Sequence, residues 1–126
     1  MVTYVEQYRL QVLRLSIHVG GTVYVVPRDS RNRPFTAKVI SAGSKYITID
    51  SVYKGDSKFT KYRYINVCTD GIEKYTLYAT KEEYDSCNML LSEIRELTND
   101  IQAKLRYMSP AALCKIKDII EQEIVV

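Results

Sequence analysis

Residues 22–80 are organised by an alternation of apolar and polar positions. The alternation is clearest in residues 46–49, 62–67 and 75–79, where Tyr, Ile, Val and Thr recur at every second position. This period is typical of strands that bury one face. The pattern predicts five short strands, at residues 22–27, 35–41, 45–53, 58–67 and 73–79.

The segments between these runs predict how the sheet is assembled. Short stretches of Gly, Asn, Asp and Ser separate the strands, and Asp70-Gly71 supplies the positive backbone angles of a tight hairpin turn. The run 22–27 is almost continuously apolar, so we expect it to be a central strand or one covered on both faces. Five short strands are too few for two packed sheets, whereas a curled barrel removes exposed edges. We therefore expect a small antiparallel β-barrel over residues 20–80.

Beyond Thr80 the apolar spacing changes to three and four residues, which predicts two helices within residues 81–126. Thr80-Lys81-Glu82-Glu83 has the form of a capping box, in which the Thr hydroxyl accepts from an amide and the Glu reaches back. Ser109-Pro110 has the form of a second helix start. The sequence therefore predicts two capped helices in succession.

Each predicted C-terminal helix carries an apolar stripe, from Tyr84 to Met108 and from Leu113 to Ile124. Such a face must be covered. We expect the helices to form a hairpin that shares the two stripes, or one of them to cross the mouth of the barrel. A homodimer through residues 84–108 is the alternative.

The N-terminal segment, residues 1–19, fits two patterns. Tyr4, Tyr8, Val12 and Leu15 share one helical face, whereas Tyr8, Leu10 and Val12 also alternate as a strand would. We favour a short helix.

Length and composition indicate a globular protein. The chain has 126 residues, 46% hydrophobic and 26% charged, which are ordinary values for one domain. Its apolar runs are far shorter than the roughly 18–20 residues needed to span a membrane, and its N-terminus lacks the basic start of a secretory signal. We expect a single cytoplasmic α+β domain over residues 1–126, with no membrane partner.

Charge is divided unevenly along the chain. Residues 1–67 hold 11 Lys and Arg against four acidic residues, while residues 68–126 hold seven against 11. Cations beside aromatic rings suit single-stranded nucleic acid, because the charges neutralise phosphates and the rings stack on bases. Arginines on a short loop suit phosphates and carboxylates alike. The candidate binding residues in the basic half are Arg28, Arg31, Arg33, Lys45, Tyr46, Lys58, Lys61, Tyr62 and Arg63.

The acidic half carries a second candidate surface on the first of the two predicted helices. Its carboxylates could face a protein channel built for nucleic acid, although an ordinary solvated helix face has the same pattern. The candidate partner-binding residues are Glu82, Glu83, Glu93, Glu96 and Asp100.

Motifs for catalysis, metals and cofactors are absent from the sequence. Cys68, Cys87 and Cys114 match no zinc spacing, and we expect them to be buried, reduced thiols. His18 is the only histidine, and no Gly-rich phosphate loop or nucleophile motif is present. We expect a protein that is not an enzyme, with no catalytic residues, no metal and no cofactor.

Three stretches resemble a group of small phage and mobile-element β-barrel-domain proteins of Gram-positive bacteria. They are Gly21 to Asp29, Gly43 to Ile49 and Tyr75 to Glu83, followed by a similar helical segment from Leu105 to Ile120. The resemblance implies an SH3-like barrel followed by helices, carried by a phage or prophage. The segment before Gly20 departs from the group's pattern.

Three functions follow from these patterns. The first is a non-catalytic phage protein that binds a host protein or ribonucleoprotein, in the manner of an anti-CRISPR inhibitor of a CRISPR nuclease. This hypothesis rests on analogy with other small phage proteins. The second is a barrel that binds nucleic acid directly. The third is a protein-binding or oligomeric adaptor.

Overall fold

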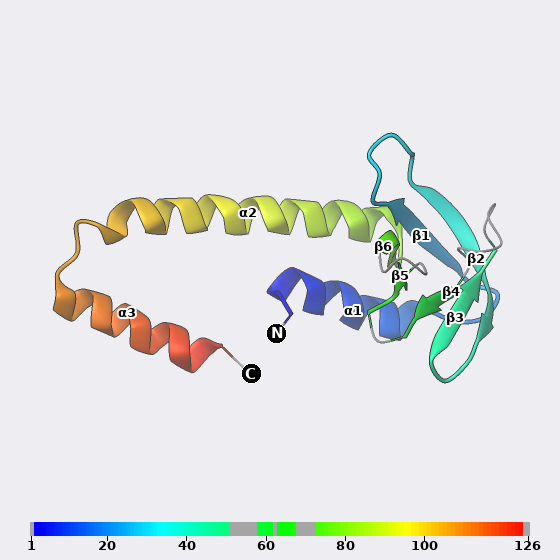
Figure 1. Cartoon of the computed structure of the whole chain (residues 1–126), viewed down its shortest axis with the longest axis horizontal. Helices are drawn as coiled ribbons and strands as arrows, with labels where there is room; N and C mark the ends of the chain where they lie inside the picture. The colour runs from blue at the N-terminus through cyan, green and yellow to red at the C-terminus, as the bar shows by residue number, and fades with distance from the viewer. Residues whose placement is uncertain (1, 51–57, 62, 68–72, 125–126) are drawn as a thin grey trace. The chain divides into compact units, whose positions relative to one another are not determined.

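The computed structural model describes residues 2–50, 58–61, 63–67 and 73–124. The contacts divide the chain into two units, Val2–Asn88 and Met89–Val126. In chain order the elements are α1 (Tyr4–Ser16), β1 (Thr22–Pro27), β2 (Phe35–Ala42), β3 (Tyr46–Ile49), β4 (Lys58–Thr60), β5 (Ile65–Val67), β6 (Glu73–Tyr78), α2 (Lys81–Leu105) and α3 (Pro110–Glu123) (Figure 1). The first unit holds α1, the strands and the first two turns of α2.

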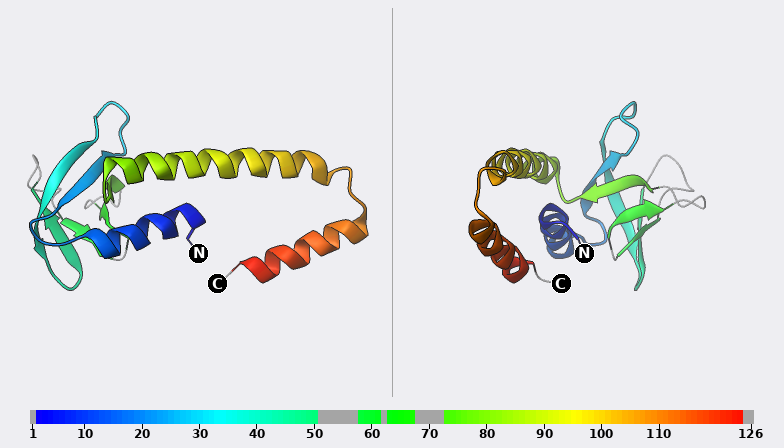
Figure 2. Two further views of the ribbon diagram at one scale, coloured as in Figure 1. Left: turned by 180° about the vertical axis from the view of Figure 1, so that it is seen from behind. Right: turned by 60° about the vertical axis from the view of Figure 1, so that its left-hand side comes forward.

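The predicted antiparallel sheet is confirmed, but it is a curled half-barrel where a small barrel was expected, and one predicted strand is divided. Its strand order is β4-β3-β2-β1-β6-β5, so β1 is central as expected. The predicted fourth strand, 58–67, is split into β4 and β5, which lie at opposite ends of this order. Because only residues 61–64 join these two strands, the ends of the sheet must come together, and the ribbon is curled (Figure 2).

The break in the fourth strand is a turn centred on Tyr64. Its backbone has a φ of 50°, a left-handed value that is uncommon for a bulky residue. Its amide donates to the carbonyl of Thr60 at 2.7 Å, and its ring is buried. The apolar alternation continues through this turn, so the sequence pattern alone predicts an unbroken strand.

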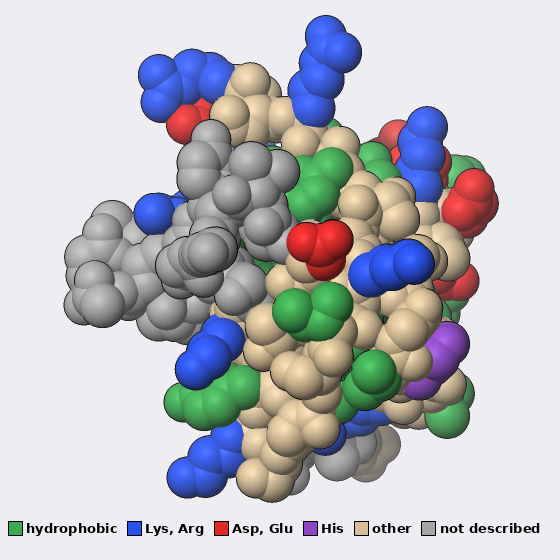
Figure 3. Space-filling model, turned by 90° about the vertical axis from the view of Figure 1, so that its right-hand side faces the viewer, with side chains coloured by type: hydrophobic (Ala, Val, Ile, Leu, Met, Phe, Trp, Pro, Cys, Tyr) green, Lys and Arg blue, Asp and Glu red, His purple; other side chains and the backbone are tan. Residues whose placement is uncertain are grey.

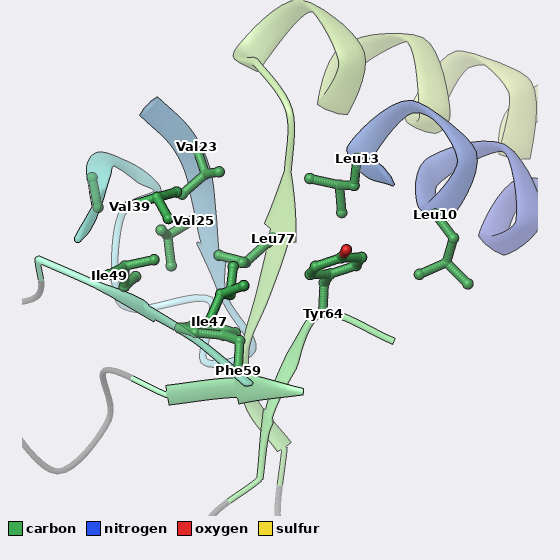
Figure 4. Close-up of a cluster of buried hydrophobic side chains, with 11 residues drawn as sticks. Leu10, Leu13, Val23, Val25, Val39, Ile47, Ile49, Phe59, Tyr64 and Leu77 are labelled. Carbon is green, nitrogen blue, oxygen red and sulfur yellow. The ribbon is translucent and has the colours of Figure 1, made fainter. Parts of the chain in front are cut away.

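Inward-facing strand residues form the core of the first unit. Val23, Val25, Ile47, Phe59 and Leu77 are each at most 2% exposed. Leu10 and Leu13 of α1 point toward this cluster and lie across from Tyr64 (Figure 4). Helix α1 therefore closes part of the half-barrel with its own side chains.

Helix α1 confirms the helical interpretation of the N-terminal segment, and it buries a different face from the one that carries Tyr4, Tyr8, Val12 and Leu15. The Thr3 hydroxyl caps the helix by accepting from the amide of Glu6 at 3.2 Å. Tyr4 and Leu15, which share the other face, are 67% and 87% exposed. The buried residues are instead Val5, Arg9, Leu10 and Leu13. The physical reason is that the buried face includes an arginine, which an apolar pattern cannot register.

Arg9 joins α1 to two distant parts of the barrel. Its guanidinium donates to the carbonyl of Leu77 in β6 at 2.7 Å and to the carbonyl of Arg63 at 2.6 Å. It also pairs with the Glu6 carboxylate at 2.7 Å. The carbonyl of Arg63 belongs to the peptide before the left-handed Tyr64, so Arg9 holds the turn that closes the sheet.

Glu6 makes this network dependent on pH. Burial alone raises the pKa of Glu6, but hydrogen bonds and charges from Arg9 and Arg63 outweigh it, and the net pKa lies below 4.5. Because the folded pKa is depressed, the stabilisation is fully present above about pH 4.5 and is lost as the pH falls through the folded value.

We expect Glu6→Gln to lower the unfolding free energy at pH 7 by roughly 1–2 kcal/mol, since hydrogen bonds to a charged group are lost. Urea titrations followed by circular dichroism at pH 7 and pH 3 test this. The difference in unfolding free energy between wild type and variant should be smaller at pH 3 than at pH 7. An unchanged difference would contradict the assigned role of the Glu6 carboxylate.

The first turns of α2 pack on the outer face of the sheet. The Tyr84 ring lies 4.9 Å from the Tyr78 ring and 5.7 Å from the Tyr24 ring, and Cys87 is buried. The predicted capping box is half confirmed, because the Thr80 hydroxyl accepts from the Glu83 amide at 3.1 Å. The Glu83 carboxylate instead accepts a hydrogen bond from the Tyr8 hydroxyl, which raises the pKa of Tyr8.

The second unit consists of the rest of α2 and α3. The Ser109 hydroxyl caps α3, as predicted, by accepting from the Ala112 amide at 3.2 Å. The stripes of the two helices do not bury one another: no described residue of α3 is buried, and Leu97, Ile101 and Ile120 are each at least half exposed. Two helices are thus confirmed, the expected sharing of their stripes is not found among the described residues, and the homodimer through residues 84–108 stays a prediction.

The cysteine prediction holds for one residue and fails for another. Cys87 is buried and free, and burial raises the pKa of its thiol. Cys114 is free but exposed, since no described residue of α2 or α3 packs over its side chain. Cys68 and the Asp70-Gly71 turn lie outside the described residues.

Neither a membrane-spanning helix nor a metal-ligand cluster occurs among the described residues. None of the helices there combines the length and the apolarity that crossing a bilayer requires. Within the same ranges, no three His, Cys, Asp or Glu side chains are grouped as a metal ion would need.

Candidate nucleic-acid interface

The loop between β1 and β2, residues 28–33, carries three arginines and is called the arginine loop below. Arg31 is already paired, since its guanidinium contacts the Asp29 carboxylate at 2.8 Å. The hydrogen bonds from the side chain and amide of Arg31 lower the pKa of Asp29. Arg28 and Arg33 are exposed, and the described residues offer neither of them an acidic partner within ion-pair distance. Two of the three arginines are therefore available to an anion.

A second basic group lies at the other end of β2 and is called the Tyr46 cluster, made of Lys45, Tyr46, Lys58 and Lys61. The Lys61 amide donates to the Lys45 carbonyl at 2.9 Å, which brings these two residues together. Tyr46 is 50% exposed, and its strand neighbour Lys58 projects on the same outer face of the β3–β4 pair. A flat ring is thus presented among lysines.

Strand β2 separates the two groups. It has eight residues, so at about 3.3 Å per residue it spans roughly 26 Å. Figure 3 shows one face of the molecule, with Lys and Arg side chains near both the top and the bottom of the view. Lys38, exposed on β2, lies between the two groups in sequence. The predicted basic residues thus form two groups along one strand, and not one compact patch.

Two of the predicted site residues are engaged elsewhere or not described. Arg63 contacts the carboxylates of Glu6 at 3.5 Å and Glu73 at 3.6 Å, so its charge is balanced within the barrel. Tyr62 lies outside the described residues. Elsewhere on the sheet, Tyr64 is buried and Tyr24 packs on Tyr84.

The acidic surface is only partly as expected. Glu82, Glu93, Glu96 and Asp100 are exposed. Asp100 pairs with Lys104 at 3.0 Å, so part of its charge is balanced. Glu83 does not belong to an open acidic face, because it is partly buried and its carboxylate meets Tyr8.

Sequence reasoning missed the residues beside the arginine loop. An open pocket of about 420 Å³ lies there, lined in part by Arg28, Asn32, Lys74 and Tyr75. The pairing of Pro27 with Tyr75 brings β6 to the base of the loop. Nothing in the local pattern near Tyr75 indicates which loop it would meet, since that depends on the pairing of β1 with β6.

Comparison with known proteins identifies the family. The chain matches the family described as Phage ProQ C-terminal-like domain over residues 3–123. No curated protein and no solved structure gives a significant match. The predicted relation to phage proteins is confirmed, and the N-terminal segment, which departs from the β-barrel-domain group named above, lies within the matched range. The match covers the half-barrel and all three helices, and the chain belongs to the Phage ProQ C-terminal-like domain family.

Proposed function

We propose that this protein binds RNA along β2, with the arginine loop at one end of the strand and the Tyr46 cluster at the other. The observation that carries the proposal is that Arg28 and Arg33 are exposed and have no acidic partner among the described residues. Arg31 and Arg63, by contrast, are each paired with a carboxylate. ProQ C-terminal domains, from which the family takes its name, are Tudor-like and related to RNA.

The two basic groups suit different parts of a nucleic-acid strand. Arginine forks donate to phosphate oxygens in pairs, which suits Arg28 and Arg33. The exposed ring of Tyr46 offers a base a stacking surface flanked by lysines, which suits an unpaired nucleotide.

Direct binding explains more of the described features than the other two hypotheses do. An inhibitor that mimics nucleic acid needs a dense acidic face, and Glu83 and Asp100 are both engaged within the chain. The inhibitor and adaptor hypotheses stay predictions, because no comparison bears on either.

Fluorescence anisotropy with a labelled single-stranded RNA of 12 nucleotides, titrated between 50 and 200 mM salt, tests the proposal. Each phosphate contact lowers the slope of log affinity against log salt by about 0.7, so four contacts predict a slope of about −3. Absence of binding at the lowest salt would contradict the proposal. Equal affinity for DNA of the same sequence would contradict the choice of RNA.

Removing the carboxylate that neutralises Arg31 should strengthen binding. Asp29→Asn leaves Arg31 unpaired, and we expect RNA affinity to rise by a few-fold, with a salt slope steeper by up to about 0.7. Anisotropy at two salt concentrations checks both values. Asp118→Asn removes an exposed carboxylate from α3 and serves as the control. A weaker or unchanged affinity for Asp29→Asn alone would argue against the arginine loop as a phosphate contact.

A further inference from the structure

The pocket beside the arginine loop lies at the end of the β1–β6 pair, where Pro27 pairs with Tyr75. Its ring residue, Tyr75, packs edge-on against Phe35 at 6.2 Å, and both rings rest on the buried core. The pocket therefore has an apolar wall that continues the core, and its other lining residues come from the arginine loop, from Pro27 of β1 and from Glu73 and Lys74 of β6. Its volume of about 420 Å³ is within the range of small-molecule pockets.

The charges around this pocket favour an anion. Two carboxylates line it, but Asp29 is paired with Arg31 at 2.8 Å and Glu73 with Arg63 at 3.6 Å. Neither of these two arginines lines the pocket. Arg28 does line it, and the described residues place no carboxylate within ion-pair distance of its guanidinium. The lining charge that stays unbalanced is therefore positive.

The uncharged groups suit a flat, polar ring. The T-shaped contact with Phe35 holds the Tyr75 ring in place, so little conformational entropy is lost when another ring stacks on Tyr75. The Asn32 side chain offers both a donor and an acceptor, which is the pair of groups that a base edge presents. The backbone amide of Asn32 donates to the backbone carbonyl of Asp29 at 3.0 Å, which fixes the loop around the Asn32 side chain.

We infer that this pocket holds one unstacked nucleotide, with the base against Tyr75 and Asn32 and the phosphate on Arg28. The inference rests on the proposed RNA binding and deepens it, because it assigns the arginine loop a nucleotide subsite as well as phosphate contacts. The Tyr46 cluster then holds another part of the same strand.

Titration of the ¹⁵N-labelled full chain with uridine 5′-monophosphate and adenosine 5′-monophosphate, followed by amide NMR shifts, tests the inference. We expect saturable shifts at Arg28, Asn32 and Tyr75, with affinity in the millimolar range. Tyr75→Leu should weaken mononucleotide binding about fivefold or more, whereas Tyr75→Phe keeps the ring and should stay within about twofold. Tyr107→Leu makes the same substitution at an exposed tyrosine of the second unit and should leave the mononucleotide affinity unchanged.

Three results would overturn the inference. The first is an absence of saturable shifts with either nucleotide, and the second is identical shifts and affinity with inorganic phosphate, which would make the pocket an anion site only. The third is an unchanged affinity for Arg28→Gln, an exposed substitution that leaves the fold intact. A 12-nucleotide RNA titrated into the same sample separates the two proposals. Shifts with RNA but not with mononucleotides would contradict only the nucleotide pocket. An absence of shifts with both ligands would contradict the proposed RNA binding as well.

Discussion

Replacing Arg9 by Met is expected to lower the unfolding free energy by about 3–5 kcal/mol, the usual effect of breaking a buried ion pair. Arg9 is 4% exposed, and it donates to the carbonyls of Leu77 and Arg63 while pairing with Glu6. Met keeps most of the apolar part of the Arg9 side chain, so the loss of unfolding free energy is attributed to the missing hydrogen bonds. Urea denaturation followed by circular dichroism measures it.

Arg14→Met is the matched control for Arg9→Met, because it makes the same substitution at an exposed position on the same helix. We expect it to change the unfolding free energy by no more than about 0.5 kcal/mol. If Arg9→Met cost less than about 1 kcal/mol, the carbonyls of Leu77 and Arg63 would not need Arg9, and α1 would be held by its leucines alone.

The largest functional effect is expected from reversing the charge of the arginine loop. In the double variant R28E/R33E, two phosphate contacts are lost and two repulsive charges are gained. We expect RNA affinity at 100 mM salt to fall by about 100-fold, and the salt slope to become shallower by about 1.4. Anisotropy with the 12-nucleotide RNA gives both values.

The control for R28E/R33E has the same change in net charge on the second unit. K115E/K117E alters two exposed lysines of α3, and we expect its RNA affinity to stay within about threefold of wild type, since long-range charge effects are screened. Equal losses in the two double variants would mean that overall charge, and not the arginine loop, governs binding.

Local sequence patterns predict most of the fold. The start and end of β1, the start of β2 and the starts of α2 and α3 follow from alternation, turn residues and capping residues. These signals are local, because a strand or a helix start is specified by the few residues that form it. The relation to phage proteins could also be stated from short sequence stretches.

Contacts between residues distant in the chain were not predictable in the same way. The buried side of α1 includes Arg9, whose partners are carbonyls 54 and 68 residues away. The turn at Tyr64 interrupts an alternation that continues unchanged in the sequence. Backbone carbonyls carry no sequence signal, so a buried arginine that binds them looks like any surface arginine.

The candidate site shows the same division. Exposed cations such as Arg28 and Arg33 could be named from composition and loop position. Which cations stay available depends on the partners of the others, Asp29 for Arg31 and Glu6 with Glu73 for Arg63. The pocket at Tyr75 depends on the pairing of β1 with β6, which the local pattern does not define.

The central claim is that RNA binds along β2 of the first unit. Amide NMR shifts of the full chain, titrated with the 12-nucleotide RNA, test it most directly because they locate the contact surface. The account predicts the largest shifts in the arginine loop, at Lys38 and in the Tyr46 cluster, and small shifts in α3. Shifts concentrated on α2 and α3, or an absence of shifts at low salt, would contradict it.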